Sequence, residues 1–326
     1  MKKLFLLIAL MGIVATGCDG FLDEDYIYDE IWYTTTDGLI EVPCAQAYEA
    51  FGANILSNNY YDSYGIIKFD DKVTKIERSA FADCRFLESI KLPNSVTKIG
   101  GAAFRDCSSL TSITIPNSVT EIGWGTFYGC TSLTTITIPN SVTWIEESAF
   151  RGCTSLRTIT IPDSVTRIGD MAFCGCTSLT RVTIGNSVTE IRDEAFYGCT
   201  SLTTITIPNS VTSIGVSAFD GCTSLTTITI PNSVTTISSS AFEDCTSLTT
   251  ITIPNSVTRI GIAAFSGCSS LKTVYCKPTL PPSGGLSMFS SNASDLKIYV
   301  PRNSVNRYKS AEYWKDYADN IVGYDF

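Results

Sequence analysis

Residues 207–229 read IPNSVTSIGVSAFDGCTSLTTIT, and this stretch decides the fold because the chain repeats it with little change. Phenylalanines and cysteines recur in the same 23-residue step, from Phe81 to Cys268. Prolines keep that step at 93, 116, 139, 162, 208, 231 and 254, and Gly185 stands at the one remaining position. A fixed period of about 20 to 50 residues is typical of a solenoid, and a period of about 23 lies in the leucine-rich-repeat range. The sequence therefore predicts nine 23-residue repeats over residues 69–275.

Within one unit, the alternation of apolar and polar residues predicts which side chains face the core. Ile136 and Ile138 point inward from a short strand while Thr135 and Thr137 point outward. Pro139 ends this strand because it has no N–H to donate. The rest of the unit predicts a second extended segment and a single helical turn, whose inward side chains are Val142, Ile145, Ala149, Phe150 and Cys153. One unit cannot bury enough surface to fold alone, so the stability must come from stacking.

The first residues predict a leader. Residues 1–17 read MKKLFLLIALMGIVATG, with two lysines before a short apolar run and then small residues, which is typical of a signal peptide. The run is too short for a transmembrane helix. The tail Ala15-Thr16-Gly17-Cys18 resembles the lipobox of bacterial lipoproteins and predicts lipidation of Cys18. Two or three acyl chains would anchor the chain stably. The alternative is an ordinary signal peptide with an incidental cysteine.

The stack needs a cap at each end because its terminal rungs would expose the core. We therefore expect a lipid-anchored spacer and N-terminal cap over residues 18–68. The aromatic segment 276–326 is the expected C-terminal cap. Both segments are interpreted as caps of one solenoid and not as independent domains.

The repeat unit resembles the BspA-type leucine-rich repeat of bacterial surface proteins. The flank from Tyr33 to Asn54 resembles the N-terminal cap of lipoproteins in that family, and the stretch from Ile298 to Trp314 resembles their C-terminal cap. The resemblance implies a horseshoe-type α/β solenoid, mostly β with short helical turns. It also implies a location on the outer membrane, facing the cell surface, and an adhesin-like role toward a protein or glycan of a host or neighbouring cell. No catalytic residues are associated with the family.

Composition excludes several classes of function. The chain has 326 residues, 13 cysteines and no histidine. Histidine is the commonest general base and metal ligand, so its absence excludes Ser-His and Cys-His nucleophile systems. The formal charge of -9 argues against nucleic acid as a partner, because a phosphate-binding surface must be basic. We predict a protein that is not an enzyme and that has no catalytic residue, metal or cofactor.

The cysteine column predicts a buried packing ladder, because free cysteine behaves as a small hydrophobic residue and equivalent side chains in a stack point the same way. Disulfides between neighbouring rungs are the alternative, since the spacing of strands permits them. Cys174 falls outside this column and is expected to be an exposed thiol. For Cys44 and Cys276 the sequence leaves local pairing open.

Recognition is expected where outward positions depart from the repeat. Trp124, Tyr128, Trp144 and Arg151 are such departures on adjacent units, and Tyr, Trp and Arg are enriched at binding hot spots. We call these four residues the aromatic–arginine patch and predict that they contact a protein or glycan. The alternative is drift among surface positions, with the tryptophan stems packed along the solenoid wall.

Two further columns have weaker interpretations. Paired outward threonines such as Thr158 and Thr160 resemble the ice-binding face of some antifreeze solenoids, although threonine is also a good exposed strand residue. Glu147, Asp170 and Asp193 share one column, which would suit Ca²⁺. Arginines nearby are expected to soften the repulsion there. The competing function for the whole chain is a structural surface-layer protein that binds its own kind or the cell's own glycans.

Overall fold

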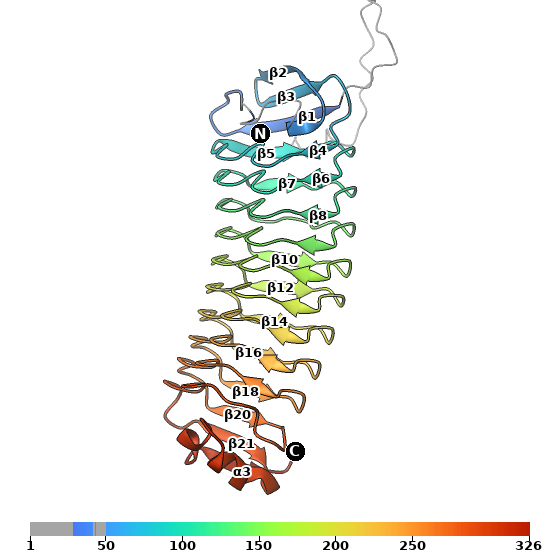
Figure 1. Ribbon diagram of the computed structural model, residues 1–326. Helices are drawn as coiled ribbons and strands as arrows, with labels where there is room; N and C mark the ends of the chain where they lie inside the picture. Colours follow the sequence, from blue (N-terminus) through green and yellow to red (C-terminus); the bar gives the residue numbers. More distant parts are fainter. Residues whose placement is uncertain (1–28, 42, 44–49) are drawn as a thin grey trace, which may run out of the picture.

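The structure is a computed structural model, and it describes residues 29–41, 43 and 50–326. The predicted leader, the lipidation site Cys18 and Cys44 lie outside these residues. The described chain forms an elongated stack of rungs that runs from an N-terminal sheet to a small helical C-terminal end (Figure 1). It is a mostly-β solenoid of about 11 turns with little helix, which confirms the predicted fold class and is roughly consistent with the nine predicted repeats.

One side of the stack is a nine-stranded parallel sheet of two-residue strands. These strands are the predicted second extended segments, and each pairs with its equivalent in the next rung. In chain order they are β4 (Lys75–Ile76), β6 (Lys98–Ile99), β8 (Glu121–Ile122), β9 (Trp144–Ile145), β11 (Arg167–Ile168), β13 (Glu190–Ile191), β15 (Ser213–Ile214), β17 (Thr236–Ile237) and β19 (Arg259–Ile260).

The longer strands of the repeat form a second side, divided into three sheets. They are β5 (Leu87–Lys91), β7 (Ser112–Thr114), β10 (Thr158–Ile161), β12 (Arg181–Ile184), β14 (Thr204–Thr206), β16 (Thr227–Thr229), β18 (Thr250–Ile253) and β20 (Thr273–Cys276). Between β7 and β10 the ladder is reduced to an isolated bridge between Thr114 and Thr137. The strands are in register, so that Thr158 lies beside Arg181 and Thr160 beside Thr183.

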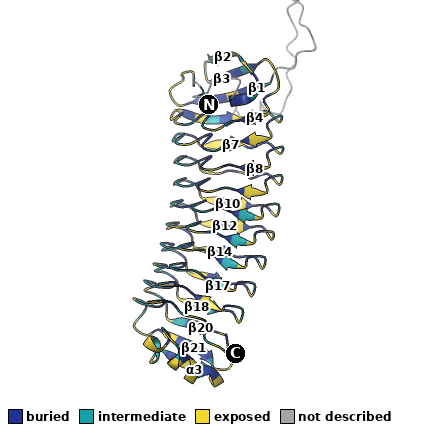
Figure 2. Ribbon diagram, viewed as in Figure 1, coloured by how far each residue is buried: buried dark blue, intermediate teal, exposed yellow. Residues whose placement is uncertain are grey.

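The positions of each unit that were predicted to face inward form the core. Figure 2 shows buried and exposed residues alternating within the rungs, and Ile136, Val142 and Phe150 are examples of the buried class. The predicted helical turn consists of tight turns closed by bonds such as Arg151 N–H to the carbonyl of Ser148. Each rung also passes through the left-handed region, for example at Gly152 with a φ of 73°.

The phenylalanine rings stack along the axis of the solenoid. Phe173, in the middle, lies 5.2 Å from Phe150 and 5.4 Å from Phe196 between ring centroids, in nearly parallel planes. The stack extends beyond the predicted repeats to Phe289, which lies 5.4 Å from Phe265. Each rung therefore packs its largest side chain against its two neighbours.

The cysteine column is a packing ladder, as predicted. From Cys107 to Cys268 these thiols are buried and unoxidised, and each donates a hydrogen bond to the phenylalanine carbonyl of the preceding rung, as Cys153 does to Phe127 at 3.1 Å. The expectation of an exposed thiol at Cys174 is wrong. Its side chain is only 7% exposed, and the turn that carries it is hydrogen-bonded to the preceding rung, where the N–H of Gly152 donates to the Cys174 carbonyl at 2.8 Å.

At the N-terminal end, three antiparallel strands continue the side that carries the longer strands. They are β1 (Glu30–Thr35), β2 (Ile55–Tyr61) and β3 (Tyr64–Phe69). β1 pairs with β5, so the cap covers the first rung directly. The ring of Phe51 also packs on Phe81 and extends the phenylalanine stack into the cap.

At the C-terminal end, two strands extend the sheet and short helices cover it. The elements are β21 (Lys297–Pro301), η1 (Arg302–Ser304), α3 (Val305–Ser310), η2 (Lys315–Tyr317) and β22 (Ile321–Tyr324). Tyr308 and Trp314 are buried against the last rungs, and they donate hydrogen bonds to the carbonyls of Pro278 and Pro282. The thiol of Cys276 lies 3.4 Å from the Tyr308 hydroxyl and forms no disulfide.

Candidate binding surfaces

Tyr128 and Arg151, two members of the aromatic–arginine patch, lie in contact. The Arg151 guanidinium carbon is 5.8 Å from the Tyr128 ring centroid, and that of Arg105 is 5.2 Å from the same ring. These three residues occupy one column on successive rungs, so the ring lies between two cations. Arg151 also donates a hydrogen bond to the sulfur of Met171 at 3.0 Å. Cation–π contacts of this kind hold both partners in place at the surface.

Trp124 lies close to this group, on the same turn as Tyr128. Its side chain lies beside Gly101 of the preceding rung. The Arg78 guanidinium approaches to 5.9 Å from the ring centroid, and the backbone N–H of Trp124 donates to the Glu146 carboxylate at 2.8 Å. The side chain remains 38% exposed, so the indole is fixed without being buried.

Trp144 lies on a different element from the other three. It belongs to β9 in the nine-stranded sheet, where its ring contacts Arg167 of the next rung at 5.5 Å. Arg167 in turn approaches Glu190 at 3.8 Å. Trp144 is also 38% exposed. The structure thus brings Tyr128 and Arg151 together beside Trp124, and it pairs Trp144 with Arg167.

Sequence reasoning missed the three arginines that cover these rings. Arg105 and Arg167 stand 23 residues from Tyr128 and Trp144, and Arg78 stands two periods from Trp124. That spacing is the signal that would have found them, because residues one period apart are neighbours along a column. The arginine that covers an exposed ring therefore lies one or two rungs away along the solenoid.

The acidic column has a structural role in this fold. The Asp170 carboxylate accepts a hydrogen bond from the backbone N–H of Asp193, and Asp193 accepts one from the N–H of Val216. Arg192 approaches Asp170 at 3.1 Å, as expected of an arginine that softens the repulsion. Among the described residues no group of three carboxylate or thiol ligands is placed to hold a metal ion. These carboxylates hold adjacent rungs together.

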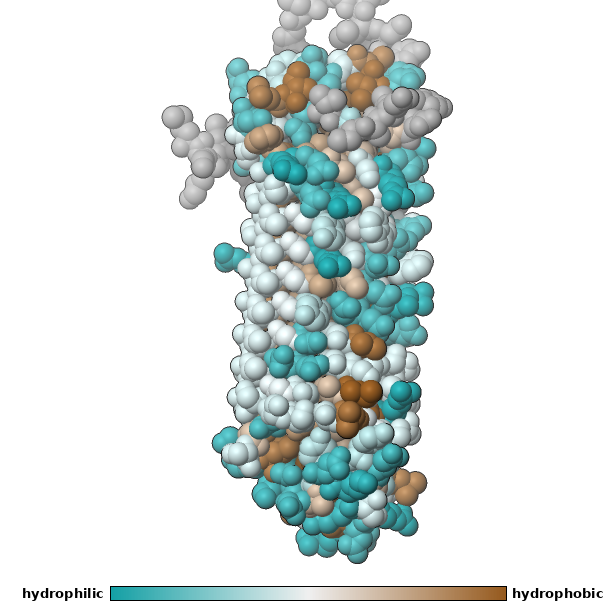
Figure 3. Space-filling model, turned by 60° about the vertical axis from the view of Figure 1, so that its left-hand side comes forward, coloured by the Kyte–Doolittle hydropathy of each residue, from teal (hydrophilic) through white to brown (hydrophobic). Residues whose placement is uncertain are grey.

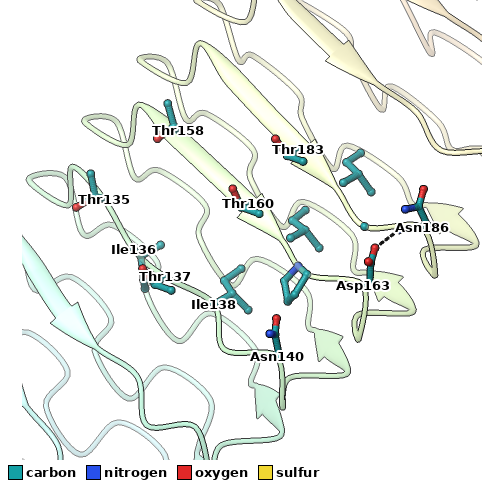
Figure 4. Close-up of a pocket in the computed structure, with 14 residues that line it drawn as sticks. Thr135, Ile136, Thr137, Ile138, Asn140, Thr158, Thr160, Asp163, Thr183 and Asn186 are labelled. Carbon is teal, nitrogen blue, oxygen red and sulfur yellow. Dashed lines mark hydrogen bonds between the residues drawn. The ribbon is translucent and has the colours of Figure 1, made fainter.

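The outward threonine columns of the longer strands form a flat surface, which we call the threonine face. Figure 3 shows one side of the molecule as a broad near-white surface of weakly polar side chains, with polar and apolar groups gathered along its edge. On the threonine face, a shallow hollow of about 740 Å³ lies over β10 and β12. Its threonines point away from the strands (Figure 4). Asn140, Asp163 and Asn186 lie along its edge, and the Asp163 carboxylate accepts the N–H of Asn186 at 2.7 Å.

Aromatic side chains lie at both ends of the threonine face. At the C-terminal end, Tyr275 continues the column of Thr252 and stacks on Tyr299 with ring centroids 5.3 Å apart. Tyr324 and Phe326 complete this C-terminal aromatic cluster and are 42% and 52% exposed. At the other end Trp32, beside Lys91, stacks on Tyr64 at 5.2 Å.

Three described thiols, those of Cys153, Cys174 and Cys176, are poor nucleophiles. Burial raises the pKa of the Cys153 and Cys176 thiols well above their ordinary range. Burial also raises the pKa of Cys174, although the charge of Arg151 opposes the shift. The thiolate is the reactive form, so all three are inert at neutral pH.

The repeat matches a known family model. That model, the BspA type leucine rich repeat region, matches residues 74–203 and 189–313. The chain belongs to this family. In this BspA-type chain the matched residues include the cysteine ladder from Cys107 to Cys268 and all four residues of the aromatic–arginine patch. No curated protein matches the chain.

The chain is similar to solved structures of leucine-rich repeat proteins. A leucine rich cell surface protein from Faecalibacterium prausnitzii A2-165 is 29% identical, over 83% of this chain and 87% of that one, with a TM-score of 0.51. A leucine-rich repeat protein from Bacteroides ovatus ATCC 8483 is 26% identical, over 92% of this chain and 100% of that one, with a TM-score of 0.40. Within the described part of this BspA-type chain, no helix has the length and hydrophobicity needed to cross a bilayer.

Proposed function

We propose that this BspA-type protein is a cell-surface binding protein that recognises an extracellular protein or glycan. The observation that carries the proposal is the exposure of Trp124 and Trp144 on a solenoid whose other surface columns are mostly threonine and serine. Exposed aromatic groups rimmed by polar residues mark interaction sites. The arginines over these rings pre-order them, which lowers the entropy lost on binding.

The surface location is part of the proposal. The family match and the described cell-surface protein from F. prausnitzii support it. The leader and Cys18 supply the expected route, with export through a signal peptide and attachment to the outer membrane by acyl chains on Cys18. The solenoid would then present its long sides to the medium, and it would act as a scaffold without catalysis.

The test is a binding screen of the chain without its leader against extracellular-matrix proteins and glycans, with sedimentation velocity on the same sample. The proposal expects a monomer that binds at least one of these partners. A chain that self-associates, and binds only itself or glycans of its own envelope, would instead be the structural surface-layer protein. That outcome would overturn the proposal.

A further inference from the structure

The threonines of the threonine face differ from the other threonines of the repeat in how their hydroxyls are used. Off this face, many threonine hydroxyls donate to the carbonyl of the preceding rung, as Thr166 does to Thr143 at 3.3 Å. On the face, the exposed hydroxyls of Thr137, Thr160 and Thr183 have no hydrogen-bond partner among the described residues. The same holds for their equivalents further along the columns. One face of the solenoid therefore presents rows of hydroxyls that are free to bind a ligand.

The charged groups in the threonine columns are cations, and the one carboxylate that lines the hollow is that of Asp163, which accepts the N–H of Asn186. The net charge of the chain is -9, yet the two outward columns between Ser89 and Tyr299 hold only cations as charged groups. Arg181 stands in place of a threonine in one column, beside the hollow. Arg157 belongs to the preceding rung and comes directly before Thr158, the residue that pairs with Arg181. Both arginines are exposed, and in the described structure neither forms an ion pair. Lys91 lies at the N-terminal end of the threonine face and Lys297 at its C-terminal end. Glu88, three residues before Lys91, adds a carboxylate near the N-terminal end.

The repeat of the face suits a polymer. Neighbouring strands are about 4.8 Å apart, a step similar to the advance of one sugar ring in an extended polysaccharide. A polysaccharide that lies along the axis would meet a new pair of hydroxyls at each rung. The eight steps from Lys91 to Tyr275 span about 38 Å at this spacing. At the end of that path the C-terminal aromatic cluster offers ring faces on which the C–H groups of a sugar can pack.

We propose that the threonine face binds an acidic polysaccharide built from uronic acid residues. Arg157 and Arg181 would pair with its carboxylates, the threonine hydroxyls would bind its hydroxyls, and Tyr275 and Tyr299 would stack on a sugar ring. A uronate polymer fits better than a densely sulfated one, because the cations are few and separated by neutral threonines. This surface is separate from the aromatic–arginine patch, so either proposal can fail without the other.

The experiment measures binding of the full-length chain, held in detergent micelles, to immobilised polygalacturonate by surface plasmon resonance. Three variants test the three contacts. Arg157→Thr with Arg181→Thr restores the repeat consensus and should weaken binding by about tenfold, which corresponds to about 1.4 kcal/mol. Thr137→Val, Thr160→Val and Thr183→Val together remove hydroxyls while keeping the β-branched shape, and should weaken binding about as much. Tyr299→Ala removes one of the two stacking rings and should weaken binding less.

Matched controls lie on the strands of the nine-stranded sheet or directly before them. Lys98→Thr with Arg259→Thr removes two exposed cations, and Thr143→Val, Thr166→Val and Thr189→Val removes three hydroxyls, and both should leave binding unchanged. The proposal is overturned if the native chain does not bind polygalacturonate at low ionic strength, or if the control variants lose as much affinity as the face variants. Equal or tighter binding of heparin or single-stranded DNA would also overturn it, because that result needs only charge.

Discussion

The phenylalanine stack gives the sharpest stability prediction, and Phe173→Ala is the substitution that tests it. Phe173 is fully buried and contacts one ring on each side, at 5.2 and 5.4 Å. Truncation of a buried phenylalanine to alanine costs about 3–5 kcal/mol. Each ring contact is worth about 0.5–1.5 kcal/mol beyond its buried area. Because two contacts are lost from the middle of the stack, we expect a loss of about 4–5 kcal/mol in the free energy of unfolding.

The assay is urea denaturation followed by circular dichroism, combined with hydrogen exchange on the native protein. Stability in a solenoid is a sum of repeat and nearest-neighbour terms, so the lost protection should be centred on the rungs of Phe150, Phe173 and Phe196. Tyr197→Ala is the matched control, because Tyr197 follows Phe196 in sequence but is 43% exposed. It should change the free energy of unfolding by less than about 0.5 kcal/mol. Equal losses in the two variants, or lost protection spread evenly over all rungs, would refute the reasoning.

Two other predictions follow from the pKa values. Burial raises the pKa of Asp220 from 3.8 to about 6, opposed by a hydrogen bond from Ser217 and reinforced by the charges of Glu243, Asp244 and Glu194. The folded state therefore holds this proton more tightly than the unfolded state, and the carboxylate destabilises the fold as pH rises from about 4 through 6. Asp220→Asn should raise the free energy of unfolding by about 1 kcal/mol at pH 8, after allowance for solvent screening, and by almost nothing at pH 3.5. A gain of the same size at both pH values in urea titrations would contradict this cause. Burial also raises the pKa of the ladder thiols, so iodoacetamide should label Cys153 and Cys176 in urea but not in the native protein at pH 8, as counted by mass spectrometry; rapid native labelling would show that the ladder opens.

Most of the repeat could be predicted because each inward position recurs with one residue type. Ile136, Val142 and Phe150 face the core as their spacing indicates. Side chains alternate along a strand and recur every three residues in a turn, and only one arrangement of a stacked unit buries the apolar residues of both. The cysteine ladder followed from the same argument. The position of these residues is fixed by backbone geometry that every rung shares.

The prediction failed where the outcome depends on contacts between particular side chains. Cys174 stands at a surface position of its column, yet it is buried, and the charge of Arg151 in the preceding rung acts on its thiol. Trp144 stands one rung from Trp124 in sequence order but lies on the nine-stranded sheet with Arg167. Position within the 23-residue unit, more than proximity in sequence, decides which surface a residue joins.

The use of the threonine hydroxyls could not be predicted from the sequence either. Thr160 and Thr166 are the same residue type within one rung, but only Thr166 reaches a carbonyl of the preceding rung. The difference arises from the direction in which each strand presents its side chains. The repeat unit alone therefore does not distinguish structural threonines from those free to bind a ligand.

The most direct test of the binding function is the affinity of the Trp124→Ala and Trp144→Ala double variant for the partner found in the screen. Both indoles are 38% exposed and neither contributes to the core, so the variant should keep the circular dichroism spectrum and the thermal midpoint of the native chain. Truncation of a tryptophan hot spot costs about 2 kcal/mol or more, so we expect its affinity to fall by at least about thirtyfold. An unchanged affinity in a folded variant would contradict the assignment of recognition to the aromatic–arginine patch.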